Sequence, residues 1–115
     1  MKIKRIAHLG IAVKDLDAPK KLYGDNLNLE LKGDEVVDTQ KVKVSFIKVG
    51  ESNLELLLPT ASDSPVAKFL ETKGEGFHHL ALEVPIEDYF MGGIVNKYFG
   101  QTTNVLYWAV WTDLE

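Results

Sequence analysis

Two histidines stand at the same place in two copies of one short sequence. Residues 7–13 read Ala-His-Leu-Gly-Ile-Ala-Val, and residues 78–84 read His-His-Leu-Ala-Leu-Glu-Val. Aligned on His8 and His79, both copies follow the pattern His-Leu-small-(Ile/Leu)-x-Val. Such a repeat predicts two related halves, and halves that pair would bring both imidazoles to one point. Two converging imidazoles can bind a metal ion in a chain that has no cysteine.

Glu55 is the third candidate ligand, because it interrupts the apolar run Leu54-Glu55-Leu56-Leu57-Leu58. An ionised carboxylate among buried leucines is unfavourable unless a partner compensates its charge. Two imidazoles and one carboxylate suit a catalytic divalent ion such as Co, Mn, Ni or Zn. Simpler interpretations stay open: a lone histidine is commonly a hydrogen-bonded structural residue, and Glu55 could be solvated on an edge strand. The repeat favours the metal site for the histidine pair.

Alternation along the first copy predicts a strand over residues 4–13 with two unlike faces. One face carries Leu9, Ile11 and Val13 and should pack on a helix. The other carries His8, Gly10 and Ala12, which leaves space in front of the imidazole. In the second copy the same alternation puts Leu80, Leu82 and Val84 on the packing side with His78, and His79, Ala81 and Glu83 on the other. His79 is therefore the better ligand candidate of the two adjacent histidines.

The remaining elements of the first half follow from its apolar pattern and its turn residues. A helix begins at Asp15 or Asp17 and ends near Asn26; its apolar side is Leu16, Leu22, Tyr23 and Leu27. Strands are predicted over 29–37, broken at 32–34, over 42–49, and over 54–58. Gln40 is a polar turn residue before the second of these, and residues 50–53 form a hairpin turn. The order is β-α-β-β-β.

The second half begins with a polar connector and then changes character. Ser64 is expected to cap a short helix with Pro65 at its first position; Val66, Phe69 and Leu70 form its apolar side. After the second copy of the repeat, a helix over 87–98 and a strand over 105–112 are predicted. We expect an α+β fold with a single domain over 1–115, consisting of a βαβββ module (1–59), a connector with a short helix (60–76), and an incomplete or altered second module (77–115).

Composition narrows the possible function classes. The 115 residues include 13 Lys+Arg and 17 Asp+Glu, a net charge of −4, so there is no basic field to attract nucleic acid. No apolar run approaches about 20 residues, so we expect no membrane span. The first residues lack the apolar stretch of a signal peptide. Without cysteine there are no disulfides, which fits a cytoplasmic protein.

From residue 3 to about residue 84 the chain resembles the methylmalonyl-CoA epimerase family of the vicinal oxygen chelate superfamily, which also includes glyoxalase I. The resemblance is most specific over residues 63–70 (Asp-Ser-Pro-Val-Ala-Lys-Phe-Leu) and 74–80 (Gly-Glu-Gly-Phe-His-His-Leu), and it extends to 8–13 and 40–46. The superfamily fold is a pair of βαβββ modules around a metal site. The resemblance implies that His8, Glu55 and His79 are three of four metal ligands, the fourth being a glutamate on the last strand.

The last 31 residues do not resemble the ending of that family. The step of 47 residues from His8 to Glu55, repeated from His79, reaches position 126, beyond Glu115. Glu115 is the only carboxylate at the end of a plausible last strand and is a weak candidate for the fourth ligand. Some members of the family carry a catalytic glutamate a few residues after the glutamine that corresponds to Gln40, and Val44 occupies that position here. The sequence therefore leaves the catalytic residues unknown.

Three hypotheses for function follow from these observations. The resemblance implies an isomerase that epimerises methylmalonyl-CoA, an acyl-CoA substrate, by proton abstraction and metal stabilisation of the enolate. The alternatives are another activity of the superfamily, of the lactoylglutathione lyase or dioxygenase type, and a non-catalytic protein that keeps the fold. A shortened second module should leave sheet edges exposed. We therefore expect a homodimer or larger assembly in which Tyr107, Trp108 and Trp111 are buried.

Overall fold

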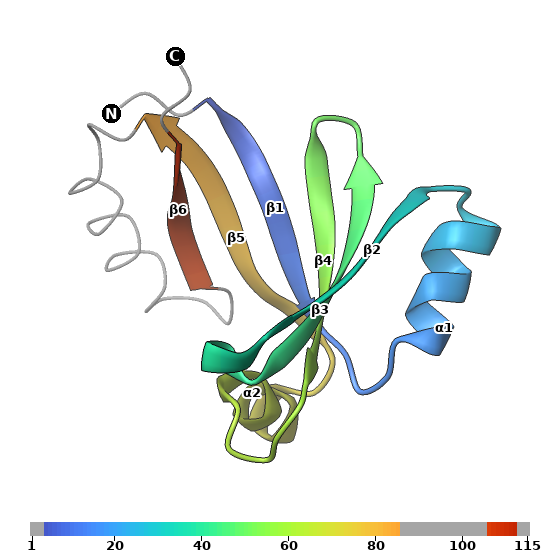
Figure 1. Cartoon of the computed structure of the whole chain (residues 1–115), viewed down its shortest axis with the longest axis vertical. Coiled ribbons are helices and arrows are strands. Elements are labelled where there is room, and N and C mark those ends of the chain that lie inside the picture. Colours follow the sequence, from blue (N-terminus) through green and yellow to red (C-terminus); the bar gives the residue numbers. More distant parts are fainter. Residues whose placement is uncertain (1–3, 86–105, 113–115) are drawn as a thin grey trace.

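The structure is a computed structural model that describes residues 4–85 and 106–112, with the backbone alone for 84, 85 and 106–112. Six strands form one mixed sheet in the order β2-β3-β4-β1-β5-β6 (Figure 1). The strands are β1 (Arg5–Ala12), β2 (Glu30–Val37), β3 (Val42–Val49), β4 (Ser52–Pro59), β5 (Gly76–Pro85) and β6 (Leu106–Thr112). The helical segments are α1 (Asp17–Lys20), which continues as η1 (Lys21–Asn26), the short turn η2 (Asp38–Gln40), and α2 (Pro65–Lys73). The predicted βαβββ order of residues 1–59 and the mixed α+β class are confirmed.

The two copies of the repeat are neighbours in this sheet, as the sequence predicts. β1 and β5 pair antiparallel, with Gly10 opposite His79. On its other edge β1 pairs parallel with β4, where Gly10 lies beside Glu55. Glu55 is therefore on an interior strand, between β1 and β3. The alternative interpretation of Glu55 as a solvated residue on an edge strand is wrong.

The second half repeats part of this arrangement. β5 pairs parallel with β6, just as β1 pairs parallel with β4. The predicted strand over 105–112 is thus confirmed as β6. The predicted helix over 87–98 lies outside the described residues, and so do the side chains of Tyr107, Trp108 and Trp111.

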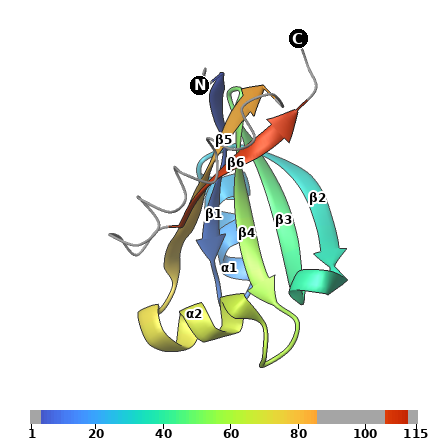
Figure 2. The same ribbon diagram turned by 90° about the vertical axis from the view of Figure 1, so that its left-hand side faces the viewer.

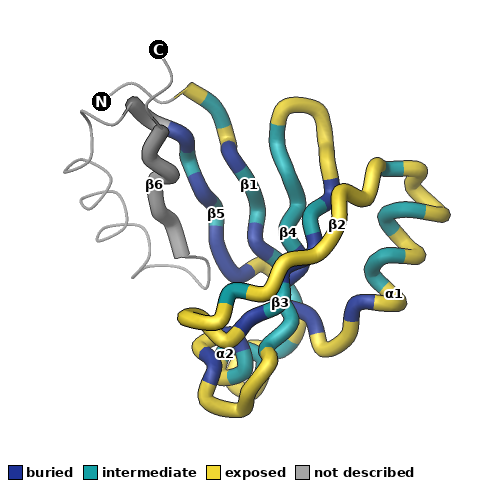
Figure 3. The backbone as a smooth tube through the Cα atoms, viewed as in Figure 1, coloured by how far each residue is buried: buried dark blue, intermediate teal, exposed yellow. Residues whose placement is uncertain are grey.

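Helices α1 and α2 pack on opposite faces of the sheet, as Figures 1 and 2 show. On one face Leu16 joins Val13, Ile47 and Leu56, with Ile11 and Tyr23 packed against them. On the other face Val66 of α2 joins Ala12, Val42, Val44 and Leu57, with Phe69 and Leu70 packed against them. Figure 3 shows that burial is concentrated along the central strands. We call the second face, which also carries His8, Glu55 and His79, the histidine face, and the first one the α1 face.

The capping predictions are confirmed, whereas the apolar side predicted for the first helix is confirmed for Leu16 and Tyr23 and wrong for Leu22 and Leu27. The Asp15 carboxylate accepts a hydrogen bond from the Ala18 N–H at 3.1 Å, and the Ser64 hydroxyl accepts one from the Val66 N–H at 3.2 Å. Leu22 and Leu27, however, are 45% and 55% exposed. The reason is that η1 winds as a π-helix, which turns these residues away from the 3.6-residue stripe that the sequence suggested.

No helix within the described part of the chain is long and apolar enough to cross a membrane.

Candidate metal centre

The three predicted ligands come together on the histidine face. Nε2 of His8 lies 2.8 Å from Nε2 of His79, and Nδ1 of His8 lies 3.1 Å from Oε2 of Glu55. The two imidazole rings meet edge to face, with their centroids 4.9 Å apart. Three residues that are far apart in sequence thus form one contiguous cluster, which the repeat and the position of Glu55 had suggested.

Strand alternation and one glycine explain why the imidazoles can meet. His8 and Gly10 point to the same face of β1, and the His79 ring lies over Gly10. A β-carbon at position 10 would lie 2.2 Å from Cε1 and 2.4 Å from Nδ1 of His79. Only glycine leaves room for the ring there. The expectation of empty space in front of His8 is therefore correct, and the His79 side chain fills part of that space.

His78 departs from the predicted alternation. Between the pairs Gly10–His79 and Ile11–Phe77 the register shifts by one residue of β5, which is a β-bulge at His78. The bulge re-aims the side chain: His78 packs edge to face against Phe69 of α2 and lies 2.9 Å from His79, Nδ1 to Nδ1. The expectation that His78 joins the packing side with Leu80 and Leu82 is wrong for this reason.

One set of tautomers satisfies all three contacts of this cluster. His78 donates from Nδ1 to Nδ1 of His79, His79 donates from Nε2 to Nε2 of His8, and His8 donates from Nδ1 to Glu55. These proton positions are assigned from the hydrogen-bond network. A cation bound to Nε2 of both His8 and His79 requires the His79 proton on Nδ1 instead. His79 then donates a hydrogen bond from this Nδ1–H group to Nδ1 of His78, which acts as the acceptor.

Burial lowers the pKa values of the two histidines, which favours the neutral imidazoles that a metal ion binds. It lowers the pKa of His8 to about 4. Burial, with the neighbouring His8 and His78, lowers the pKa of His79 to about 2. Both rings are therefore neutral near pH 7 and keep a lone pair for a cation. Burial, with the nearby charge of Glu35, raises the pKa of Glu55 to about 7, so this carboxyl is close to half-ionised at that pH.

The two facing imidazole nitrogens fit a divalent cation by their chemistry and spacing. Two ligand atoms in neighbouring positions, each about 2.1 Å from a cation, lie about 3.0 Å from one another, close to the 2.8 Å between the two Nε2 atoms. In the present arrangement Glu55 contacts the other nitrogen of His8. Accordingly, within residues 4–85 and 106–112 no three such side chains surround a common point. The structure thus shows a pair of facing imidazole nitrogens with a carboxylate beside them.

The register of the second half identifies the residue that corresponds to Glu55. Gly10, two residues after His8, pairs with Glu55. Ala81, two residues after His79, pairs with Trp108. Trp108 thus occupies in β6 the register position that Glu55 occupies in β4. Strand β6 contains no carboxylate, and Glu115 lies outside the described residues.

An ion pair between a half-buried arginine and a buried glutamate links the far ends of the same two strands. Glu83 is only 6% exposed, and its Oε1 lies 2.8 Å from Nη2 of Arg5. Arg5 also donates to the Glu51 carbonyl in the β3–β4 turn. Because Glu83 is already paired with a guanidinium, it is not available as a further ligand in this arrangement.

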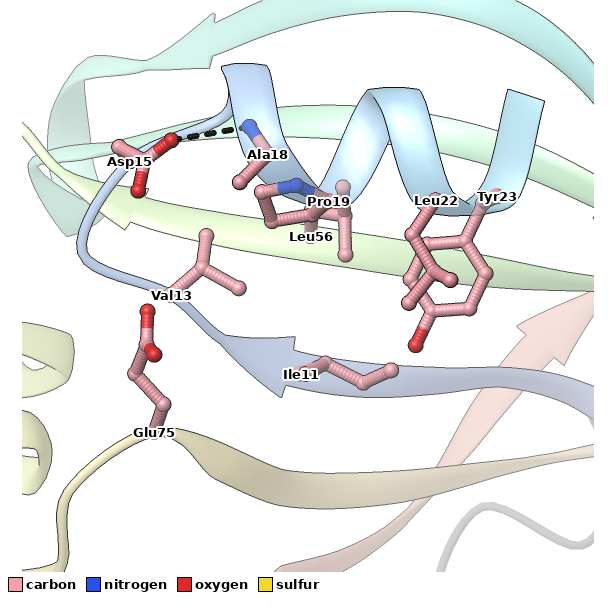
Figure 4. Close-up of a pocket in the computed structure, with 9 residues that line it drawn as sticks. All are labelled: Ile11, Val13, Asp15, Ala18, Pro19, Leu22, Tyr23, Leu56 and Glu75. Carbon is pink, nitrogen blue, oxygen red and sulfur yellow. Dashed lines mark hydrogen bonds between the residues drawn. The ribbon is translucent and has the colours of Figure 1, made fainter. Parts of the chain in front are cut away.

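The best-formed pocket in the described part lies on the other side of the sheet. It has a volume of about 270 Å³ and is bounded by α1 and β1, with Ile11, Val13 and Tyr23 along its wall and Asp15 and Glu75 at its rim (Figure 4). Ile11 and Val13 alternate with Gly10 and Ala12, so this pocket opens on the α1 face. It does not communicate with the histidines.

The comparisons with known proteins agree with this fold. A profile of the glyoxalase/bleomycin resistance protein/dioxygenase superfamily matches residues 7–90. The chain therefore belongs to this superfamily. The matched region contains all three candidate ligands.

Within the superfamily, the relatives carry a more specific name. The chain is 36% identical over 84 residues to mitochondrial methylmalonyl-CoA epimerase of Mus musculus (72% of this chain, 47% of the mouse protein). It is 37% identical over 83 residues to an ethylmalonyl-CoA/methylmalonyl-CoA epimerase of Cereibacter sphaeroides (71% and 62%). An uncharacterised Bacillus subtilis protein, YqjC, is 43% identical over 79 residues (69% and 56%). The chain spans about half the length of these curated relatives.

Solved structures share the fold over nearly the whole chain. A Streptomyces coelicolor methylmalonyl-CoA epimerase variant in complex with 2-nitronate-propionyl-CoA is 30% identical, with a TM-score of 0.82, over 98% of this chain and 100% of that one. A hypothetical protein of Bacillus halodurans is 28% identical, with a TM-score of 0.84, over 96% of both chains. The predicted vicinal oxygen chelate fold is thereby confirmed.

Proposed function

We propose that the chain is a metal-dependent isomerase that epimerises methylmalonyl-CoA or a closely related acyl-CoA. The observation that supports this most directly is the convergence of His8, Glu55 and His79 on one face of a sheet whose relatives are named methylmalonyl-CoA epimerases. The substrate class is supported by the acyl-CoA analogue bound to the Streptomyces coelicolor enzyme.

In this proposal His8, His79 and Glu55 hold a divalent ion. The ion, when bound, would stabilise negative charge on the oxygens of the thioester and carboxylate. The chain supplies the rest. Burial keeps both imidazoles neutral and available for binding, and the Glu55–His8 contact fixes the orientation of the His8 ring. Residues that move the proton must therefore face the same side of the sheet.

The test is turnover of (S)-methylmalonyl-CoA with Co²⁺ or Mn²⁺ added, followed as formation of the (R)-epimer. We expect turnover by the wild-type chain, together with binding of about one ion per chain. A double variant, His8→Ala with His79→Ala, should lose both. Unchanged metal content in that variant would reject the ligand assignment, and turnover of the glutathione hemithioacetal of methylglyoxal instead would indicate glyoxalase chemistry.

A non-catalytic protein that keeps the fold is the second candidate. This candidate is favoured by the position of Trp108, which corresponds to Glu55 in the strand register. The last described strand therefore has a tryptophan where β4 has a carboxylate. Tight metal binding without turnover of either substrate is the result expected from this candidate.

A further inference from the structure

Strand β2 places a carboxylate, Glu35, on the histidine face. Glu35 lies directly opposite Val44 of β3, and Val44 lies opposite Leu57 of β4. Directly opposite residues point to the same side of a sheet. Leu57 and Val44 are both in the core cluster on the histidine face. Glu35 therefore belongs to that face as well.

The contacts of the neighbouring residue give the same orientation independently. Oδ2 of Asp34 lies 2.7 Å from Nζ of Lys20, at the end of α1. Asp34 thus points to the α1 face. Because successive side chains of a strand point to opposite faces, Glu35 points to the histidine face.

The strand register also gives the distance along the sheet between Glu35 and the candidate ligand Glu55. Two strand spacings and two residues along the strand separate the two Cα atoms, about 12 Å on a flat sheet.

The environment of Glu35 differs from that of the ligands. Glu35 is exposed, whereas His79 is 3% exposed. Within the described residues no lysine, arginine or histidine forms an ion pair with Glu35. The side chains of Lys20 and Lys43 contact the adjacent Asp34 instead. An accessible carboxylate on the same face as a cation site can act as a general base.

We propose that Glu35 is the carboxylate that removes the proton from the substrate on the β2 side of the site. This proposal rests on the proposed epimerase function. In the step, the C2–H bond of the acyl-CoA breaks and its electron pair moves into the thioester carbonyl to give an enolate. The proton forms an O–H bond with a carboxylate oxygen of Glu35. The sequence did not suggest this role, because it places Val44 where other members of the family carry a glutamate.

The test is the variant Glu35→Gln, measured in two ways. Exchange of the C2 hydrogen of methylmalonyl-CoA with solvent deuterium, followed by NMR with Co²⁺ present, reports proton removal. Titration with Co²⁺ alone, followed by visible absorption, reports the metal site. We expect the exchange rate and kcat to fall at least about 100-fold, with KM changed less than about threefold and Co²⁺ binding retained. Glu35→Asp should recover part of the exchange.

The matched control is Glu71→Gln, the same substitution at an exposed position of α2, which should leave exchange unchanged. Exchange by Glu35→Gln within about threefold of wild type overturns this proposal alone. Loss of Co²⁺ binding together with exchange also overturns it, because Glu35 then supports the metal site rather than moving a proton. A wild-type chain that binds Co²⁺ but exchanges no proton overturns both this proposal and the epimerase function.

Discussion

The distance between the two imidazoles depends on Gly10. Any other residue at this position would place a β-carbon within 2.2 Å of the His79 ring. We expect Gly10→Ala to displace His79 and lower the affinity for Co²⁺ at least about 10-fold, with a loss of about 1–3 kcal/mol in stability from overpacking. Titration with Co²⁺ and urea unfolding measure the two effects.

Gly24→Ala is the control for this substitution. A β-carbon at Gly24 would lie 3.0 Å from the flexible end of Leu31, far from the histidines. Its Co²⁺ affinity should equal that of the wild-type chain. Equal affinity in Gly10→Ala as well would show that His79 is not a ligand.

The dependence of metal affinity on pH should report a single carboxyl group. The pKa of Glu55 is raised to about 7 by burial and Glu35, whereas the pKa of His8 is lowered to about 4 and that of His79 to about 2. Below pH 7 a cation must displace the proton of Glu55, while both imidazoles are already neutral. The affinity for Co²⁺ should therefore rise about 10-fold per pH unit between about pH 5 and pH 7 and then level off.

Glu55→Gln is the variant that isolates this effect. It carries no titratable proton, so its weaker affinity should be nearly constant over the same range. Histidines with ordinary pKa values would instead give a steeper rise below about pH 6.5, because two further protons would have to leave. A slope of two or three protons would contradict the buried, neutral state of the imidazoles.

At the scale of elements, α2 depends on its N-cap residue. Ser64 is 1% exposed; its hydroxyl accepts from the Val66 N–H and donates to the Gln40 carbonyl at 3.3 Å. We expect Ser64→Ala to lower the free energy of unfolding by about 1–2 kcal/mol, because it removes the cap and a link to η2. Thr72→Ala, at an exposed position of the same helix, should cost less than about 0.5 kcal/mol. Similar losses in the two variants, measured by urea unfolding, would count against the capping role.

The elements from β1 to α2 could be predicted because their signals are local. Alternation fixes the two faces of β1, Ser64 and Pro65 mark the start of α2, and turn residues separate β3 from β4. The same local reasoning suggested the ligands, because His8 and His79 hold equal places in a repeat.

What the sequence could not predict depends on pairing between distant strands. The bulge at His78 exists because β5 has one extra residue between the pairs Gly10–His79 and Ile11–Phe77, and a second shift between Ile6 and His8 of β1 restores the register. Glu35 could not be assigned to a face either. A second register shift, between Leu31 and Gly33, precedes it in β2, and alternation counted across a bulge gives the wrong side. The π-helical continuation of α1 likewise leaves no mark in the apolar pattern.

At the scale of the whole molecule, the two halves share the same parallel strand pairing but differ in the residues at corresponding positions. β1 with β4 and β5 with β6 are corresponding parallel pairs, joined by the antiparallel contact of β1 with β5. His8 and His79 hold corresponding places in them, but Glu55 corresponds to Trp108. The described strand β6 therefore offers no carboxylate equivalent to Glu55 as a fourth ligand.

The two edges of the described sheet differ in how they resist association. β2 carries four charged side chains in its eight residues, a common protection for an edge strand. β6 reads Leu-Tyr-Trp-Ala-Val-Trp-Thr and carries none. A second copy of the chain is therefore expected to add to β6 rather than to β2. We therefore expect the interface of the predicted homodimer to lie at β6.

The substitution Val110→Lys introduces a charge into β6 and should convert the dimer into a monomer, because an ammonium group is costly to bury at an interface without a partner. Val36→Lys is the matched control in β2; Val36 is 52% exposed, and this variant should remain dimeric. Sedimentation equilibrium measures the mass, and the emission maximum of Trp108 and Trp111 should shift to longer wavelength only in Val110→Lys. A monomeric wild-type chain with solvent-exposed tryptophan emission contradicts the dimer itself. A dimer that survives Val110→Lys but dissociates in Val36→Lys would instead place the interface at β2, where it would cover the strand that carries Glu35.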